Sequence, residues 1–342
     1  MIKFILLTLF STSIMAFNLD TEIAELNREF NNYEEYPIII FNKSEIKQLV
    51  KDKNHKDQVT LIKDHLFTRF NLKINKYEAD TILTYHTALD SSASALPFKA
   101  TDNKTYRFCA VFPSGSDNNH IQEVERSLGI TPGQNPYPTQ TINQISEKMS
   151  LKELKLISLY HELSHCLDRK YIPNVMDPSS HDIHEAESFA ETMALLLLQE
   201  RKGFHKTPLN RSLHRTMYSK YMGKFLATDE DLIVFDPIIR DGGIVYFLSP
   251  VILATQKLIN DFDYRTSNKD LDSMIKNAEE IVYYNSISAR DFAALRIYFK
   301  EGREAAINQY KEMAVNSPDY FLMTYKNLKT YIDLIEEVDL FL

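Results

Sequence analysis

The chain has 342 residues, of which 44% are hydrophobic and 25% are charged, and its formal net charge is −8. This length accommodates a catalytic region with an additional lobe, and the composition is that of a globular protein. The acidic balance, together with the lack of any block of five or more basic residues in the sequence, argues against nucleic acid as a partner. Only 8 glycines are present, which argues against a large all-β architecture.

Residues 1–16, MIKFILLTLFSTSIMA, have the layout of a secretory signal peptide. Lys3 precedes an apolar run from Phe4 to Phe10, and small or polar residues follow. This run is shorter than the roughly twenty residues that span a bilayer, so a cleaved signal is favoured over a membrane anchor. We expect no later segment to be apolar enough to span a membrane, since even MALLLL at residues 193–198 is short and flanked by glutamates. We therefore expect an exported protein, periplasmic or secreted, without stable membrane insertion after signal cleavage.

Residues 17–135 are expected to form an α/β region. Its expected elements are helices at Glu22–Phe30 and Ser44–Lys51 and strands at Tyr36–Phe41 and Thr105–Phe112. The strand Thr105–Phe112 is the best candidate, and we expect it to be an edge strand. The stretch Thr131–Thr139 carries three prolines and a glycine, which predicts a linker or loop at the end of this region.

Two cysteines, Cys109 and Cys166, are present, which excludes a disulfide framework as the main source of stability. One bridge between them and two buried free thiols are both compatible with the sequence.

The motif with the most specific chemistry is HELSH at residues 161–165. Ser150 and Glu153 form a capping box before a helical pattern without proline or glycine, so His161 and His165 lie one turn apart on the same face. At this spacing two imidazoles can reach one zinc ion. Glu162 lies beside the pair, where it can take a proton from water rather than bind the metal. A chance occurrence on an amphipathic helix is the alternative.

A second helix is expected from His181 in HDIHEAESFAETMALLLLQ. Glu187 and Glu191 lie one turn apart on it, so both can face the same neighbour. One carboxylate can complete a three-ligand site, while the other can accept a hydrogen bond from the far nitrogen of a ligating histidine. A solvated acidic face is the alternative interpretation of the same pair.

HELSH, followed after twenty-one residues by ESFAE, resembles the gluzincin metallopeptidases, in which a glutamate on a following helix is the third ligand. The glutamate helix is similar to those of the aminopeptidase-type and lethal-factor-type enzymes. The resemblance implies one zinc ion per chain, bound by His161, His165 and Glu187, with Glu191 as the hydrogen-bond partner of His161. Glu185 competes with Glu187, but only Glu187 has an acid one turn later.

A fainter resemblance follows at residues 241–259, DGGIVYFLSPVILATQKLI, which is similar to the thermolysin-type segment that leads to a catalytic histidine. The histidine is absent here, and Tyr246 stands near its position. By that resemblance Tyr246 would donate a hydrogen bond to the oxyanion that forms when water attacks an amide carbonyl. His181 and His184 are alternative donors, although histidines in a polar loop are more often simply solvated. A buried tyrosine without a catalytic role is the other alternative.

The expected fold is α+β and mainly helical, with a small N-terminal sheet. The expected divisions are the signal peptide at 1–16, the N-terminal α/β region at 17–135, a zinc-binding catalytic core at 136–260 and a helical region at 261–342. In the last region, Ser288 and Asp291 form a capping signal. The resemblance adds that the core is zincin-like, built on an active-site helix and a glutamate helix.

The sequence thus predicts an exported zinc metallopeptidase with a peptide or protein substrate and Glu162 as general base. Endopeptidase activity is slightly favoured, since no GxMEN-type stretch precedes HELSH. By analogy with the family, an extended substrate would pair with the strand Thr105–Phe112. The alternatives are an inactive zinc-binding or interaction module and a hydrolase of non-peptide amides. The intact Glu162 favours an enzyme, because a structural zinc site needs no base.

Overall fold

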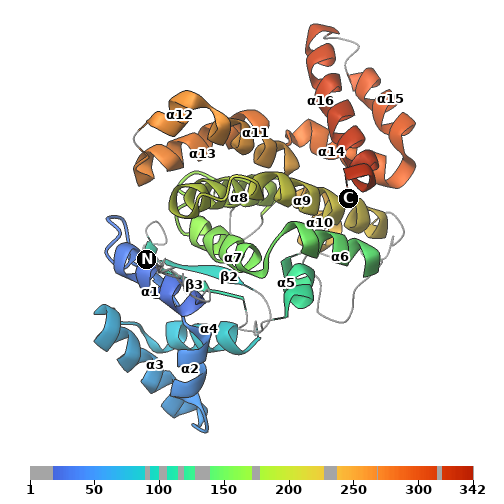
Figure 1. The fold of residues 1–342 in the computed structure, drawn as a ribbon. Helices are drawn as coiled ribbons and strands as arrows, with labels where there is room; N and C mark the ends of the chain where they lie inside the picture. The colour runs from blue at the N-terminus through green and yellow to red at the C-terminus, as the bar shows by residue number, and fades with distance from the viewer. Residues whose placement is uncertain are drawn as a thin grey trace, which may run out of the picture.

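The fold is mainly helical with one small sheet (Figure 1), which confirms the expected mainly helical α+β class. The computed structural model describes residues 18–88, 93–99, 106–114, 119–127, 139–171, 178–226, 237–267, 269–313 and 318–341. The expected signal peptide at 1–16 lies outside these residues, as does the expected loop up to residue 138.

Four helices and three strands make up the N-terminal part. They are α1 (Leu19–Phe30), β1 (Ile38–Ile40), α2 (Lys43–Val50), α3 (His55–Phe70), α4 (Lys76–Ala88), β2 (Ser94–Lys99) and β3 (Tyr106–Phe112). Helix α2 begins earlier than expected, because Asn42 and not Ser44 caps it: the Asn42 side chain accepts a hydrogen bond from the Glu45 amide. Helices α3 and α4 and strand β2 were not predicted from the sequence.

The sheet has the strand order β1-β3-β2, with β1 parallel and β2 antiparallel to β3. The expectation that residues 105–112 form an edge strand is therefore wrong, since β3 is central. The physical reason is that both faces of β3 are covered: from Phe108 to Phe112 the strand is fully buried, as is typical of a continuous apolar run. The long exposed edge belongs to β2, which is mostly half-buried.

Seven helices follow the sheet. They are α5 (His120–Ser127), α6 (Thr139–Lys148), α7 (Leu151–His165), α8 (Ser180–Lys202), α9 (Thr207–Leu226), α10 (Pro237–Val245) and α11 (Ser249–Asn260). The predicted capping box of Ser150 and Glu153 begins α7. Helix α8 begins with a second capping box, formed by Ser179 and Asp182. The two helices pack along each other, and α7 lies between α8 and the sheet (Figure 1).

The C-terminal part is helical, as expected. It comprises α12 (Phe262–Thr266), α13 (Leu271–Asn285), α14 (Ala289–Glu301), α15 (Arg303–Met313), α16 (Pro318–Glu337) and the short 3-10 helix Val338–Phe341. Ser288 caps α14 and pairs with Asp291, as the sequence predicts. Helices α14, α15 and α16 group together at one end of the molecule (Figure 1).

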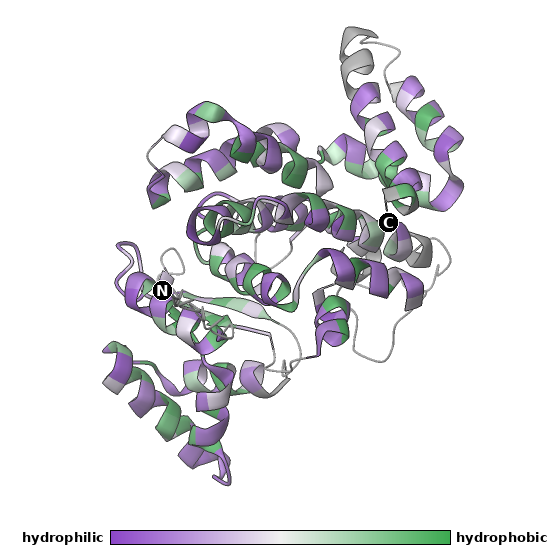
Figure 2. Cartoon of the chain, viewed as in Figure 1, coloured by the Kyte–Doolittle hydropathy of each residue, from purple (hydrophilic) through white to green (hydrophobic). Residues whose placement is uncertain are grey.

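Successive residues of β1 and β3 point to opposite faces of the sheet and enter two different hydrophobic clusters. Cys109 and Val111 join the large cluster around α1, α7, α8, α11 and α13, whereas Phe108 and Ala110 join a second cluster under α2, α3 and α4. A third cluster fills the space between α10 and helices α14 to α16. Hydrophobic and hydrophilic stretches alternate along many of these helices, as expected for helices with one buried face (Figure 2). The large cluster draws on all three regions that the sequence analysis divided at 135/136 and 260/261.

Cys109 and Cys166 form a disulfide, with their Cα atoms 5.8 Å apart. The structure thereby decides between the two states that the sequence left open. The bridge joins the central strand β3 to the residue that follows His165, at the end of α7. The end of the helix that carries both motif histidines is therefore covalently attached to the sheet.

Of the described residues, one helical stretch, Asp241–Asn260, is long and apolar enough by composition to cross a membrane. This corrects the expectation that nothing after the signal peptide is sufficiently apolar. Of this stretch, 67% is buried inside the protein. The break between α10 and α11, at residues 246–248, further divides it. Core packing of α10 and α11 explains the apolar composition.

Candidate metal centre

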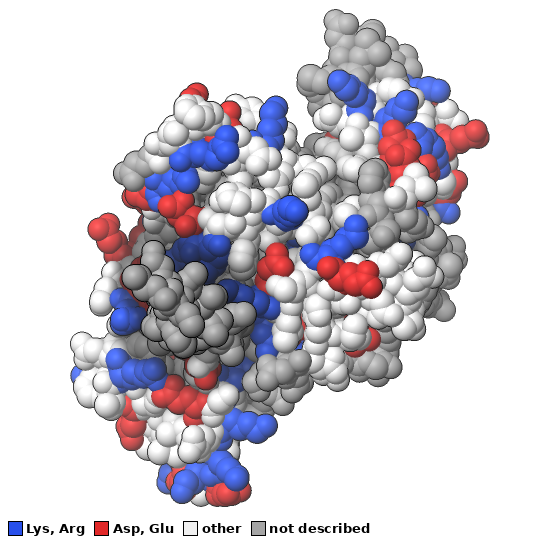
Figure 3. All heavy atoms as spheres, in the orientation of Figure 1, with Lys and Arg blue, Asp and Glu red and all other residues white. Residues whose placement is uncertain are grey.

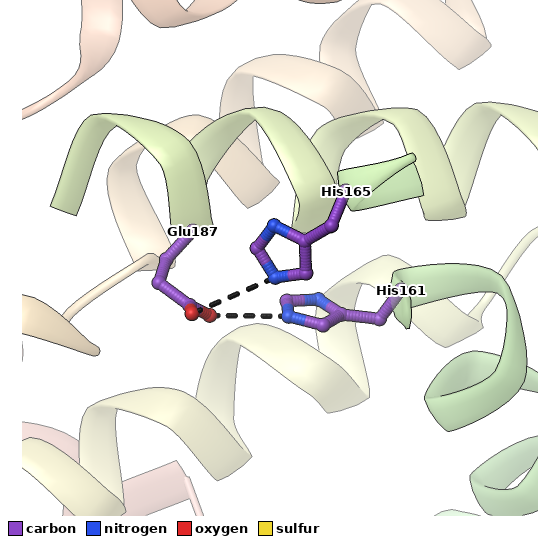
Figure 4. Close-up of side chains that lie close together, drawn as sticks. All are labelled: His161, His165 and Glu187. Carbon is purple, nitrogen blue, oxygen red and sulfur yellow. Dashed lines mark hydrogen bonds and ion pairs between the residues drawn. The ribbon is translucent and has the colours of Figure 1, made fainter. Parts of the chain in front are cut away.

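His161, His165 and Glu187 converge where α7 packs against α8 (Figure 4). Nε2 of His161 lies 3.1 Å from Oε2 of Glu187, and Nε2 of His165 lies 3.6 Å from Oε1 of the same carboxylate. The two imidazoles come from consecutive turns of α7, as their spacing predicts. The structure therefore brings together the three residues that the sequence analysis proposed as ligands.

The packing of α8 determines which of its faces meets the histidines. Phe189, Met193 and Leu196 are fully buried in the large cluster, and this apolar stripe fixes the rotation of the helix. Glu187 is thereby directed at the α7 histidines. Glu185 instead faces His181, with 3.8 Å between Oε2 and Nδ1.

The three side chains fit a zinc ion by chemistry and by spacing. Imidazole nitrogens and a carboxylate oxygen are ordinary zinc ligands, and atoms at ~2.0–2.1 Å from a tetrahedral ion lie about 3.3–3.4 Å from one another. The separations of 3.1 and 3.6 Å bracket that value. Three protein ligands would leave a fourth position of a tetrahedral zinc ion open.

Glu191 lies on the far side of His161. Its Oε2 is 3.2 Å from Nδ1 of His161, so the carboxylate can fix the orientation of the ring whose other nitrogen faces Glu187. Two arginines of α9 hold Glu191 in turn: Arg211 Nε donates to Oε1 at 2.5 Å and Arg215 Nη2 to Oε2 at 2.7 Å. Burial by itself would raise the pKa of Glu191, but the two guanidinium groups outweigh it and hold that pKa well below its usual value.

Sequence reasoning missed Arg211 and Arg215. Their four-residue spacing could have indicated a shared partner, because two arginines one turn apart on a helix can bind the same carboxylate. Which carboxylate they meet depends on the packing of α9, and the sequence pattern does not specify it.

Glu162 lies on the wall of a cavity of about 720 Å³, as do His161, His165 and Glu187. Burial raises the pKa of Glu162 to about 7, against the opposing effects of His161 and Arg215. The backbone of Ala95, on the edge strand β2, forms a hydrogen bond with this carboxylate. A carboxyl group with this pKa can accept and return a proton near neutral pH.

Tyr246 also lines this cavity. The centroid of its ring is 5.5 Å from that of Tyr218 and 5.5 Å from Cζ of Arg215. The negative charge of Glu187, followed by burial, raises the pKa of Tyr246 well above its usual value, so the phenol keeps its proton and can donate it to a hydrogen bond. Tyr218 is a second phenol on the wall, which the sequence analysis did not identify.

The alternative donors do not line the described cavity. His184 is only 1% exposed, which corrects the expectation of a solvated loop histidine. Its Nδ1 donates to the Val245 carbonyl at 2.8 Å, and its Nε2 accepts from the Ile287 amide at 3.1 Å. His181 lies 3.0 Å from the Ile287 carbonyl through Nε2. Both histidines lie in the first turns of α8. Their polar contacts attach this end of α8 to Val245 and Ile287.

Comparisons with protein-family models, with curated proteins and with solved structures found no match to this chain. The candidate centre is therefore interpreted from its own geometry.

Proposed function

We propose that this protein is an exported zinc metallopeptidase of the gluzincin type. One observation carries the proposal: His161, His165 and Glu187 converge in a single cavity on whose wall Glu162 also lies. A site that only bound zinc structurally would need neither the acid beside the ligands nor the cavity. The same observation therefore disfavours an inactive zinc-binding module.

His161, His165 and Glu187 would bind the zinc ion, which supplies Lewis-acid activation of water and of the substrate carbonyl. Glu162 accepts the proton of the attacking water and returns it to the leaving amine. Tyr246 donates a hydrogen bond to the oxygen of the attacked carbonyl, where negative charge develops. Glu191 holds His161 in the tautomer that leaves Nε2 free of a proton.

Because β3 is central, an extended substrate would pair with the edge strand β2 and not with β3 as first expected. Ser94, Ala95 and Pro97 of this strand line the cavity. An extended peptide that pairs with the β2 edge would bring its backbone past Glu162, which already bonds to Ala95. This arrangement suits cleavage within a peptide and supports endopeptidase activity.

The disulfide supports export of the protein. Stable disulfides form in oxidising compartments and are rare in the cytosol. The bridge between Cys109 and Cys166 is buried, which is consistent with a structural role.

The first prediction concerns the metal. We expect one zinc per chain in the protein beginning at Phe17, measured by elemental mass spectrometry after dialysis. Glu187→Ala removes a ligand and should reduce the zinc content to a small fraction of that of the parent. Glu185→Ala is the matched control, because it removes a carboxylate of the same helix that faces His181. A folded parent without zinc, even after zinc is added back, would contradict the proposal.

The second prediction concerns catalysis. Glu162→Gln keeps the size of the side chain and removes the base, so zinc content should stay at one per chain while hydrolysis of a quenched-peptide library falls by about 10²–10⁴-fold. Glu185→Gln is the control and should retain full activity. Turnover at the parental rate in Glu162→Gln would refute the assigned role of the base.

A further inference from the structure

Three arginines line one part of the cavity: Arg126 of α5 and Arg211 and Arg215 of α9. We refer to these three residues as the arginine wall. Arg211 and Arg215 are 3% and 7% exposed, and the side chain of Arg126 is 8% exposed. Buried arginines are rare unless they are paired, so the charges around them determine what the wall can bind.

Within the described part of the chain, two members of the arginine wall depend on a single carboxylate. Glu191 is the single carboxylate that binds both Arg211 and Arg215. The repulsion between these two guanidinium groups adds to burial in lowering the pKa of Arg211, although both arginines stay charged near neutral pH. Arg126 is paired with Glu123, with 3.2 Å between Nη1 and Oε2. Among the described residues, Arg126 and Glu123 balance each other, whereas Arg211 and Arg215 share one directly bonded carboxylate.

Glu187 and Glu162 also interact electrostatically with Arg215 when no metal is bound. The two positive charges of a zinc ion would be matched by Glu162 and Glu187. Asp168 lies beside His165 at the end of α7, where it accepts hydrogen bonds from the amides of Lys170 and Tyr171. With zinc bound, Glu191 would therefore be the carboxylate left to Arg211 and Arg215 on the His161 side of the cavity, whereas Asp168 lies on the His165 side. On the face shown in Figure 3, acidic and basic side chains are interspersed.

The arginine wall is also held rigidly. His214 is buried, and its Nδ1 accepts a hydrogen bond from Arg211 Nη1 at 3.1 Å. The other ring nitrogen lies 3.3 Å from the Ser127 hydroxyl. Burial, followed by the charges of Arg211 and Arg215, holds the pKa of His214 well below its usual value, so it stays neutral and adds no charge. Arg215 in turn stacks on the ring of Tyr246. Guanidinium groups fixed in this way bind a carboxylate with little further ordering.

We propose that the arginine wall binds a carboxylate of the peptide substrate, close to the bond that is cleaved. The inference rests on the proposed function, because it takes the cavity as the peptide-binding site. Arg215 shares Glu191 with His161 and contacts the ring of Tyr246. Since an extended peptide advances about 3.3 Å per residue, the carboxylate belongs to a residue within one or two positions of the reacting carbonyl. An acidic side chain and a chain terminus both supply that group.

Binding to zinc-loaded Glu162→Gln protein tests this without requiring turnover. The probes are fluorescein-labelled, C-terminally amidated peptides that differ in one internal residue, Glu, Gln or Lys. We expect the Glu peptide to bind at least tenfold more tightly than the other two, and the preference to shrink as salt rises from 50 to 500 mM. A neutral peptide with a free C-terminus, compared with its amide, separates the two sources of the carboxylate.

Arg215→Gln in the same background is the decisive variant, because it removes the second guanidinium group on Glu191 and leaves Glu191 paired with Arg211. The preference for Glu over Gln should fall to less than threefold. Arg126→Gln is a second variant, at a residue that binds neither Glu191 nor the proposed zinc ligands. It should also reduce the preference for the Glu peptide. Arg303→Gln, in the C-terminal helices, is the control. A preference that survives both wall variants, or equal binding of all the peptides by the Glu162→Gln protein, overturns the inference.

The cleavage assay distinguishes this inference from the proposed function. Parental protein that cleaves neutral and acidic peptides at equal kcat/KM supports the peptidase and refutes the acidic subsite. Tight carboxylate-dependent binding without cleavage by the parent supports the subsite and refutes the peptidase.

Discussion

His184 shows how a polar residue can stabilise the core and make stability depend on pH. Both ring nitrogens are used, one as a donor to Val245 and the other as an acceptor from Ile287. The ring therefore joins α8 to the end of α10 and to the start of the segment that precedes α14. Acceptance at Nε2 requires a neutral ring, and burial accordingly lowers the pKa of His184 to about 4.

The third prediction follows from this pKa. The unfolded chain takes up a proton at His184 below about pH 6.5, whereas the folded chain does so only below about pH 4. Stability is therefore fully present above pH 6.5, and about 3 kcal/mol of it is lost as the pH falls to 4. We expect urea unfolding between pH 7 and pH 4.5 to show a shallower pH dependence in His184→Gln than in the parent. His205→Gln, at an exposed histidine, is the matched control. Parallel curves for His184→Gln and the parent would contradict the assignment.

Residues related by helical spacing could be predicted from the sequence, and residues related by packing could not. His161, His165, Glu187 and Glu191 occupy two helices whose periodicity and capping boxes are local properties. Arg211, Arg215 and Tyr218 lie on α9, and their positions in the centre depend on how α9 packs on α10 and α11. The sequence pattern of α9 contains no information about that crossing.

At the scale of elements, glycines allow α9 and α10 to approach closely. A Cβ atom on Gly243 would lie 2.5 Å from the backbone nitrogen of Gly223, and one on Gly242 would meet only the Tyr218 hydroxyl, at 3.6 Å. The Gly-Gly pair that resembles a thermolysin-type segment therefore has a packing role in this chain. The close approach at these glycines determines how near α10 lies to α9. It thereby also determines the position of Tyr246, the residue that directly follows α10.

The fourth prediction uses the two glycines as a matched pair. Gly243→Ala should cost about 1–3 kcal/mol of unfolding free energy, because backbone cannot yield to the new methyl group as a flexible side chain can. It should also lower the catalytic rate by displacing Tyr246. Gly242→Ala should leave both quantities near the parental values. Urea unfolding and peptide cleavage measure the two effects, and equal behaviour of the two variants would contradict the packing account.

The sheet shows where sequence patterns mislead at the element scale. The run YRFCAVF predicts a strand, but the sequence does not show that this strand is central. Its neighbour β2 is hard to predict, because β2 contains a proline and shows no regular alternation of burial. Pro97 is tolerated in β2 because this strand lies at the edge, where one side makes no ladder hydrogen bonds. Edge and centre are properties of the assembled sheet, so a single strand pattern does not determine them.

At the scale of the whole molecule, the C-terminal helices complete the core. Met274, Ile275 and Val282 of α13 belong to the large hydrophobic cluster around α7 and α8. The fifth prediction is that a chain ending at Asp261 loses cooperative unfolding in urea and does not retain zinc, because the buried surface of α8 would be exposed to water. A truncated chain that unfolds cooperatively with zinc bound would show instead that the C-terminal helices are dispensable.

The disulfide divides the ligands between two covalent parts of the chain. Cys109 and Cys166 close a ring of residues that contains His161 and His165, whereas Glu187 lies outside it. An oxidised but unfolded chain therefore keeps the two imidazoles inside the loop, without the carboxylate. The full ligand set forms only when α8 docks on α7, so zinc retention reports tertiary assembly and not the presence of the motif helix.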